Sequence, residues 1–121
     1  GLNLNMSIPS IIIYNLGNHD SKLINEILYG IEEEGIPYMI ENRNEDEFKS
    51  IDEASYKASL SSQLSVGIAL SREYIVMHYA NLKEGNPLFK YSLKETTLNN
   101  IRNFGANAAR MVKGIYFILK N

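Results

Sequence analysis

Hydrophobic positions along the chain fall into short continuous runs and into longer stretches with helical spacing. Residues 11–14 are all β-branched or aromatic, which is typical of a strand buried on both faces. Apolar positions then recur at helical spacing over residues 20–34, namely Leu23, Ile24, Ile27, Leu28 and Ile31. Gly35 can end this helix and Pro37 prevents its continuation, so residues 37–40 are expected to form a second strand. The first third of the chain therefore predicts a β-α-β unit.

The middle of the chain predicts a second helix followed by a hairpin. Residues 41–53 are polar and acidic, residues 42–46 among them are typical of a loop, and residues 51–60 can form a modest helix. Residues 64–70 and 74–79 are mostly apolar, which indicates two buried strands. Because so few residues separate them, we expect these two strands to be antiparallel.

The last third predicts one more helix and one more strand. After a loop that contains Gly85 and Pro87, a stripe of apolar and small residues has helical spacing: Leu98, Ile101, Gly105, Ala108 and Val112. Residues 115–119 are expected to form the final strand. The whole pattern indicates an α/β sandwich in which one strand runs in reverse.

Length and charge limit the function classes. The 121 residues suit one domain, which we place at residues 6–121, with residues 1–5 interpreted as an expression scar or a disordered N-terminus. A net charge of −2 with dispersed Lys and Arg gives no footprint for nucleic acid. The absence of cysteine fits a reducing cytoplasm, and no apolar run approaches membrane-spanning length. We expect a cytoplasmic protein that binds neither nucleic acid nor membrane.

The first predicted helix ends with three consecutive glutamates, Glu32, Glu33 and Glu34. Negative charge at a helix C-terminus is unfavourable, because the exposed carbonyl groups already make that end negative. Glu26 and Glu33 share a face with Tyr29 and Gly30 between them, so a cation or a cationic partner could bind there. The residues alone favour the simpler alternative, a solvated acidic helix end.

Small residues in two predicted helices indicate close backbone contacts. Gly30 is unfavourable inside a helix, and an intersubunit interface and internal packing explain it equally well. Gly105, Ala106, Ala108 and Ala109 leave one side of the last helix almost without side chains. We expect another backbone to lie close there, and packing against the chain's own sheet is favoured over an intersubunit contact.

Candidate catalytic residues find little support. His19 follows the first strand, where α/β proteins often bind ligands, but its surroundings lack the glycines of a nucleotide-binding loop, so a local capping role is favoured. His78 lies in a predicted strand and is interpreted as structural. The serines between residues 55 and 65 lack a nucleophile-elbow pattern. We therefore expect no catalytic site and no cofactor bound by the chain alone.

Three blocks of sequence resemble one family, the small subunits of diol and glycerol dehydratase-reactivating factors. The blocks are INEILYGIEEEGIP at residues 24–37, VGIALS at 66–71 and RNFGANAARMVK at 102–113. The last block is also similar to the medium subunit of the coenzyme B12-dependent dehydratases themselves. Residues 42–64 and 80–97 match the family poorly, and Asn18 stands where a second histidine is expected.

The resemblance implies a fold and a function. The implied fold is a three-layer α/β/α sandwich of anticodon-binding-domain-like topology, with a mixed five-stranded sheet whose fourth strand is antiparallel. The implied protein is a non-catalytic subunit that joins a large chaperone-like ATPase subunit in an α2β2 complex. That complex releases damaged cobalamin from inactivated diol or glycerol dehydratase by exchanging subunits with it, in the cytoplasm or in a bacterial microcompartment.

The resemblance also implies a role for the acidic helix end. In this family the glutamate corresponding to Glu33 completes a Mg²⁺ or Ca²⁺ site whose other carboxylates belong to the large subunit. Glu26, Tyr29, Gly30 and Glu32 are then further candidates for the interface. Hard cations prefer such oxygen ligands, but a single carboxylate binds them poorly, so the isolated chain should bind metal poorly.

Two alternatives compete with this interpretation. The chain could be the medium subunit of a dehydratase, although such chains usually carry N-terminal extensions. It could also be an independent small-molecule-binding α/β domain that uses the turn around His19.

Overall fold

The computed structural model describes residues 8–17 and 21–114. The elements in chain order are β1 (Ile11–Asn15), α1 (Ser21–Glu33), β2 (Tyr38–Asn42), a 3-10 turn η1 (Glu45–Glu47), α2 (Ile51–Ser61), β3 (Val66–Leu70), β4 (Tyr74–Tyr79), β5 (Phe89–Ser92), a second 3-10 turn η2 (Leu93–Glu95) and α3 (Leu98–Lys113). Within this part of the chain, no helix is both long and apolar enough to cross a membrane.

The strands form one mixed sheet in the order β2-β1-β3-β4-β5. β1 lies between β2 and β3 and is parallel to both, whereas β4 is antiparallel to β3 and to β5. β4 is thus the reversed strand, which confirms the hairpin predicted from the short turn and the mixed five-stranded sheet implied by the family resemblance.

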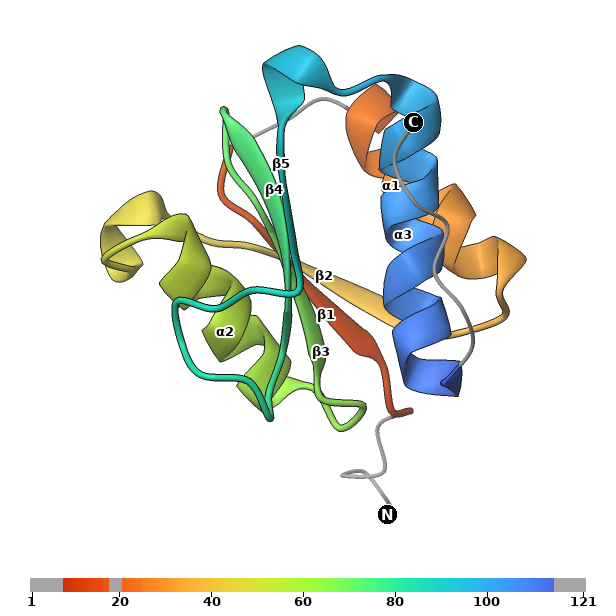
Figure 1. The fold of residues 1–121 in the computed structure, drawn as a ribbon, viewed down its shortest axis with the longest axis horizontal. Helices are drawn as coiled ribbons and strands as arrows, with labels where there is room; N and C mark the ends of the chain where they lie inside the picture. Colours follow the sequence, from red (N-terminus) through yellow and green to blue (C-terminus); the bar gives the residue numbers. More distant parts are fainter. Residues whose placement is uncertain (1–7, 18–20, 115–121) are drawn as a thin grey trace.

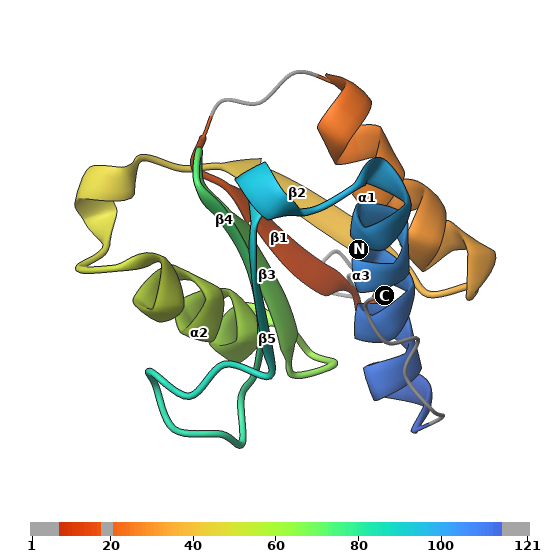
Figure 2. The same ribbon diagram turned by 45° about the horizontal axis from the view of Figure 1, so that its top comes forward.

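Helices cover the two faces of the sheet unequally. α1 and α3 lie side by side on one face and α2 lies alone on the other, as Figure 1 and Figure 2 show. The larger core forms beneath α1 and α3 because alternate side chains of the strands point to that face. A smaller cluster, built around Ile12, Tyr14 and Ala58, lies under α2. This arrangement is the expected three-layer α/β/α sandwich.

The predicted helix and strand bounds agree with the structure in most places. Gly35 lies two residues after the last residue of α1 and has a φ of +76°, as expected for the glycine that ends the helix. Ser50 and Thr97 are the N-cap residues of α2 and α3, since each hydroxyl accepts a hydrogen bond from the backbone N–H of the third residue of its helix. β2 extends to Asn42, two residues beyond the predicted end of the second strand at residue 40.

The fifth strand differs from the prediction. It is β5, which lies in the segment after Gly85 and Pro87 that the sequence suggested was a loop. β5 is only four residues long and lies at the edge of the sheet, where a strand needs few apolar residues. Its Phe89 and Tyr91 rings nevertheless pack edge-on against Phe104 of α3. The strand predicted at residues 115–119 lies outside the described residues.

Candidate functional site

α1 and α3 cross at two glycines. A Cβ atom added at Gly30 would overlap the carbonyl oxygen of Arg102, and one added at Gly105 would overlap the carbonyl oxygen of Ile27. Gly30 therefore serves internal packing, one of its two possible explanations. The close backbone expected beside the small face of α3 belongs to α1 rather than to the sheet, which corrects the favoured interpretation, although Ala108 and Ala109 do join the core.

The glycine crossing places Arg102 of α3 among three side chains of α1. Its Nε donates to Oε1 of Glu26 over 3.2 Å, and its NH1 group donates to Oε2 of Glu33 over 3.3 Å. The guanidinium carbon also lies 5.3 Å from the centre of the Tyr29 ring. Because positions 26, 29 and 33 recur on one face of α1, a single arginine can contact all three.

The third carboxylate of the acidic helix end, Glu34, lies between two cations. The Nε and NH2 groups of Arg110 each approach its Oε2 at 3.2 Å. The Nζ of Lys113 donates to its Oε1 over 2.9 Å and to its main-chain carbonyl over 3.0 Å. The hydrogen bond from Lys113, reinforced by the charge of Arg110, lowers the pKa of Glu34 below its usual value despite partial burial.

Glu32 also has an intramolecular partner. The Tyr38 hydroxyl of β2 donates to its Oε2 over 2.9 Å, and this contact with a carboxylate raises the pKa of Tyr38. All three glutamates at the end of α1 are thus paired within the chain, so α3 and β2 offset the unfavourable charge at this helix terminus. The pairing explains how the acidic end is tolerated without any metal.

Glu33 is far more exposed than Glu34. Its side chain is 55% exposed, compared with 14% for Glu34. Among the residues that the structure describes, no three His, Cys, Asp or Glu side chains lie close enough together to hold a metal ion.

The remaining candidates have structural roles or lie outside the structure. His19 is not among the described residues. His78 is fully buried, with Nδ1 at 3.1 Å from the carbonyl oxygen of Tyr79 and its ring edge-on to Tyr56. The hydroxyls of Ser55, Ser59 and Ser61 donate to carbonyl groups one turn earlier in α2. The structural interpretation of His78 thus agrees with its position.

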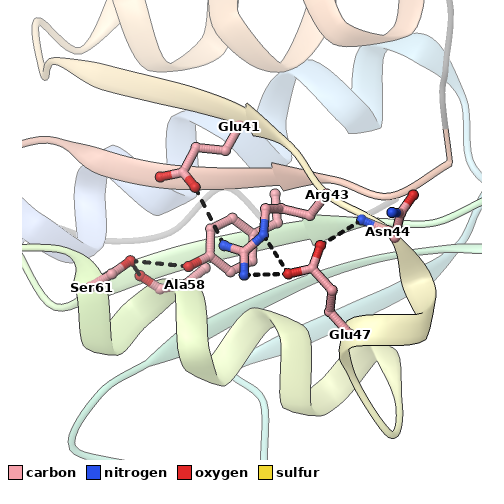
Figure 3. A network of polar contacts seen from close by, with 7 residues as sticks. Glu41, Arg43, Asn44, Glu47, Ala58 and Ser61 are labelled. Carbon is pink, nitrogen blue, oxygen red and sulfur yellow. Dashed lines mark hydrogen bonds and ion pairs between the residues drawn. The ribbon is translucent and has the colours of Figure 1, made fainter.

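The sequence patterns did not indicate a polar network that lies at the end of β2. Arg43 donates to Glu47 at 2.9 and 2.6 Å and to Glu41 at 3.3 Å (Figure 3). Its guanidinium also stacks 4.5 Å from the centre of the Tyr14 ring. The contact with Glu47 raises the pKa of Arg43 and lowers that of Glu47. The sequence signal for this ion pair was the presence of opposite charges four residues apart, at Arg43 and Glu47. The network fixes the segment after β2 against β1.

A groove of about 480 Å³ lies beside this network, at the carboxyl ends of β1 and β3. Open α/β sheets often bind ligands at the carboxyl ends of two adjacent strands whose following connections lead to opposite sides of the sheet. Lys49 and Arg72 line it together with Glu45 and Glu73, so the lining favours neither a cation nor an anion. The groove does not identify a ligand class.

Replacing Glu34 with glutamine is expected to make the chain less stable at neutral pH by about 1 kcal/mol, because the ion pairs with Arg110 and Lys113 are lost. The lowered pKa means that this stabilisation is present above the usual glutamate pKa of 4.5 and disappears as the pH falls through the folded-state value. Urea denaturation from pH 7 to pH 3 should therefore show the two proteins converging in acid. Glu84→Gln, in an exposed loop, is the matched control, and a difference that stays constant with pH would contradict the prediction.

Comparison with known proteins places these features in a family. The family described as dehydratase medium subunit matches residues 8–118. The propanediol dehydratase-reactivating factor small subunit of Salmonella typhimurium is 42% identical over 93% of each chain. The diol dehydratase-reactivating factor small subunit of Klebsiella michiganensis is 41% identical over 96% of this chain and 89% of that protein.

Solved structures agree with the sequence comparison. A diol dehydratase-reactivating factor complexed with ADP and Mg²⁺ contains a chain that is 39% identical, with a TM-score of 0.82 over 93% of this chain and 99% of that one. A glycerol dehydratase reactivase chain is 28% identical, with a TM-score of 0.85 over 94% of this chain and 100% of that one. The chain therefore belongs to the dehydratase medium-subunit family and, within it, groups with the small subunits of dehydratase-reactivating factors.

Proposed function

We propose that this chain is the small, non-catalytic subunit of a reactivating factor that restores inactivated coenzyme B12-dependent dehydratase. The observation that carries the proposal is the similarity to reactivating-factor small subunits along almost the whole of both chains. A small subunit implies a large one, and we assign ATP hydrolysis to that partner in an α2β2 complex. One solved relative is a reactivating factor complexed with ADP and Mg²⁺, which supports a nucleotide site in such a complex.

In this proposal the chain provides a binding surface for the large subunit and catalyses no reaction. It binds the large subunit, and its departure lets the large subunit contact the damaged dehydratase, so that damaged cobalamin is released by exchange of subunits. The similarity to the dehydratase medium-subunit family supports this mechanism, because a chain that resembles a dehydratase subunit can compete for the same partner surface.

The acidic end of α1 is the proposed contact with the large subunit. Glu33 would supply one oxygen ligand to a Mg²⁺ or Ca²⁺ ion, with the other ligands coming from the partner. The residue fits this role because its side chain is more than half exposed and only its Oε2 is used by Arg102. Glu26, Tyr29 and Glu32 lie on or beside the same face, while Gly30 contributes by bringing α3 close.

The diol system is the proposed client of this reactivating factor. The relatives with 41–42% identity carry diol or propanediol in their names, and the solved diol factor is more similar in sequence than the glycerol reactivase, at 39% against 28%. Reconstitution with the large subunit, followed by reactivation assays on inactivated diol and glycerol dehydratases, would test this assignment. Equal or better recovery of the glycerol enzyme would contradict it.

Substitution of Glu33 tests the proposed metal contact. Glu33→Gln should weaken binding to the large subunit at least tenfold in the presence of Mg²⁺. Mutation of a residue that only orients a metal ligand typically lowers metal affinity by about tenfold or more, and the loss of the ligand itself should cost at least as much. Chelation of the metal should weaken the wild-type complex and leave the variant unchanged. Isothermal titration calorimetry against the large subunit measures both effects.

Glu32→Gln is the matched control for this experiment. It removes the same charge from the adjacent position, and its carboxylate is already bound by the Tyr38 hydroxyl. Its affinity for the large subunit should keep its Mg²⁺ dependence. Equal loss in both variants would show that general charge, rather than a ligand at Glu33, supports the complex.

A further inference from the structure

Arg102 bridges two carboxylates that differ greatly in exposure. The Glu26 side chain is 21% exposed and lies against Nε, whereas the Glu33 side chain is 55% exposed and meets only the outer NH1 group. The Tyr29 ring adds a third contact to the guanidinium group. The contact with Glu33 is thus the outermost part of the arrangement, and exposed ion pairs of this kind are weak.

The anchor of Arg102 is fixed by the fold. Its carbonyl oxygen lies so close to Gly30 that an added Cβ would overlap it, so the backbone from which the side chain projects is held against α1. Nε can remain on Glu26, and the guanidinium can remain beside Tyr29, when NH1 leaves Glu33. Loss of the contact between NH1 and Oε2 would therefore free Glu33 from the arginine without loss of the contact between Nε and Glu26.

A cation and Arg102 compete for the same carboxylate. The NH1 nitrogen of the charged guanidinium lies 3.3 Å from Oε2 of Glu33, so the arginine offsets the negative charge there and repels a second cation. We propose that Arg102 is a positioning residue that masks Glu33 in the free subunit and yields it to the divalent cation when the large subunit binds. This inference rests on the proposed function, because it concerns the same contact.

Arg102 has two effects in the isolated chain. Arg102 holds the Glu33 carboxylate near the position from which it would meet the partner, and it suppresses metal binding before the partner arrives. Removal of its charge should therefore make the isolated chain bind divalent cations better. A residue that only stabilised the helix pair would not have this effect.

Paramagnetic Mn²⁺ added to the isolated, ¹⁵N-labelled chain tests the inference without the large subunit. Line broadening of amide signals around Glu33 should appear in Arg102→Gln at Mn²⁺ concentrations several-fold lower than in the wild type. Arg102→Lys, which keeps the positive charge, should lie closer to the wild type. The Arg102→Gln and Glu33→Gln double variant should lose the gain.

Arg110→Gln is the matched control, because it removes an arginine of the same helix that pairs with Glu34 instead of Glu33. Equal Mn²⁺ titrations for Arg102→Gln and the wild type, or equal gains in Arg102→Gln and Arg110→Gln, would overturn the inference. The amide spectrum reports folding directly. If Arg102→Gln does not fold, Glu26→Gln decides the question, because it leaves the arginine with Glu33 and the Tyr29 ring and should weaken Mn²⁺ broadening by more than Glu32→Gln, which removes the same charge.

The two proposals fail in different experiments. Binding of the wild-type chain to the large subunit with no dependence on Mg²⁺ would contradict the proposed metal contact but leave the Mn²⁺ titrations valid. If the contact exists, half-maximal complex formation should need several-fold less Mg²⁺ with Arg102→Gln than with the wild type. A higher requirement would show that Arg102 helps to hold the cation site and would overturn the masking role.

Discussion

Gly30→Ala is expected to lower the free energy of unfolding by about 2–3 kcal/mol, the cost of forcing extra volume into a closely packed contact. The added Cβ would overlap the carbonyl oxygen of Arg102 and crowd the backbone nitrogen of Ala106. Neither obstacle is a flexible side chain, so α3 must move away from α1. Alanine favours helix over glycine by about 1 kcal/mol, and this gain offsets only part of the cost. Urea denaturation followed by circular dichroism measures the change.

Gly35→Ala is the matched control for Gly30→Ala. Gly35 lies at the end of the same helix with no atom within 4 Å of an added Cβ, but its φ is +76°. An alanine there should cost about 1 kcal/mol from backbone strain alone. If Gly30→Ala were as stable as the wild type, the two helices would be able to separate freely, and Arg102 would not be fixed at the acidic end of α1.

The elements with strong periodicity could be predicted from the sequence. α1 was expected over residues 20–34 and is Ser21–Glu33, and β4 has its expected bounds, Tyr74–Tyr79. Both segments carry a continuous signal, apolar spacing in one and a buried run in the other, and Gly35 marks the end of α1. Local chemistry decides such elements, so a single sequence suffices.

Partners distant in the chain could not be predicted in this way. Arg102 and Glu33 are 69 residues apart, and Lys113 and Glu34 are 79 residues apart. Nothing near Glu33 in sequence indicates that three basic side chains of α3 would offset the acidic helix end. The glycines and alanines of α3 did predict a close backbone, but small residues do not specify which neighbour approaches.

The short edge strand β5 shows a related limit. Its Phe89 and Tyr91 alternate with Lys90, and four residues provide too few periods to distinguish a strand from a loop. Packing against Phe104 of α3, more than ten residues later, stabilises it. Its pairing with β4 is therefore a consequence of the completed core rather than a local preference.

On the opposite face, Gly67→Ala is expected to lower the free energy of unfolding by about 3 kcal/mol, near the upper end of the usual cost of overpacking. An added Cβ would overlap the backbone nitrogen of Ser59 and crowd both the carbonyl carbon and the Cβ of Ala58. α2 lies this close to β3 because its buried positions Ala54, Ala58 and Ser59 are small. The helix must rise from the sheet to admit the methyl group, which opens the smaller core around Ile12 and Tyr14.

A double variant separates the two causes of this loss. Ala58→Gly removes the Cβ contact but leaves the overlap with the Ser59 nitrogen, so Gly67→Ala with Ala58→Gly should remain less stable than Ala58→Gly alone, as measured by urea denaturation. Full rescue would mean that one methyl group, rather than the helix backbone, limits the approach of α2. Because α2 lies on the face opposite α1 and α3, Gly67→Ala should leave the affinity for the large subunit unchanged at temperatures where the variant is folded. Gly30→Ala should reduce that affinity under the same conditions, since it forces α3 away from α1 and so distorts the face that carries the proposed contact.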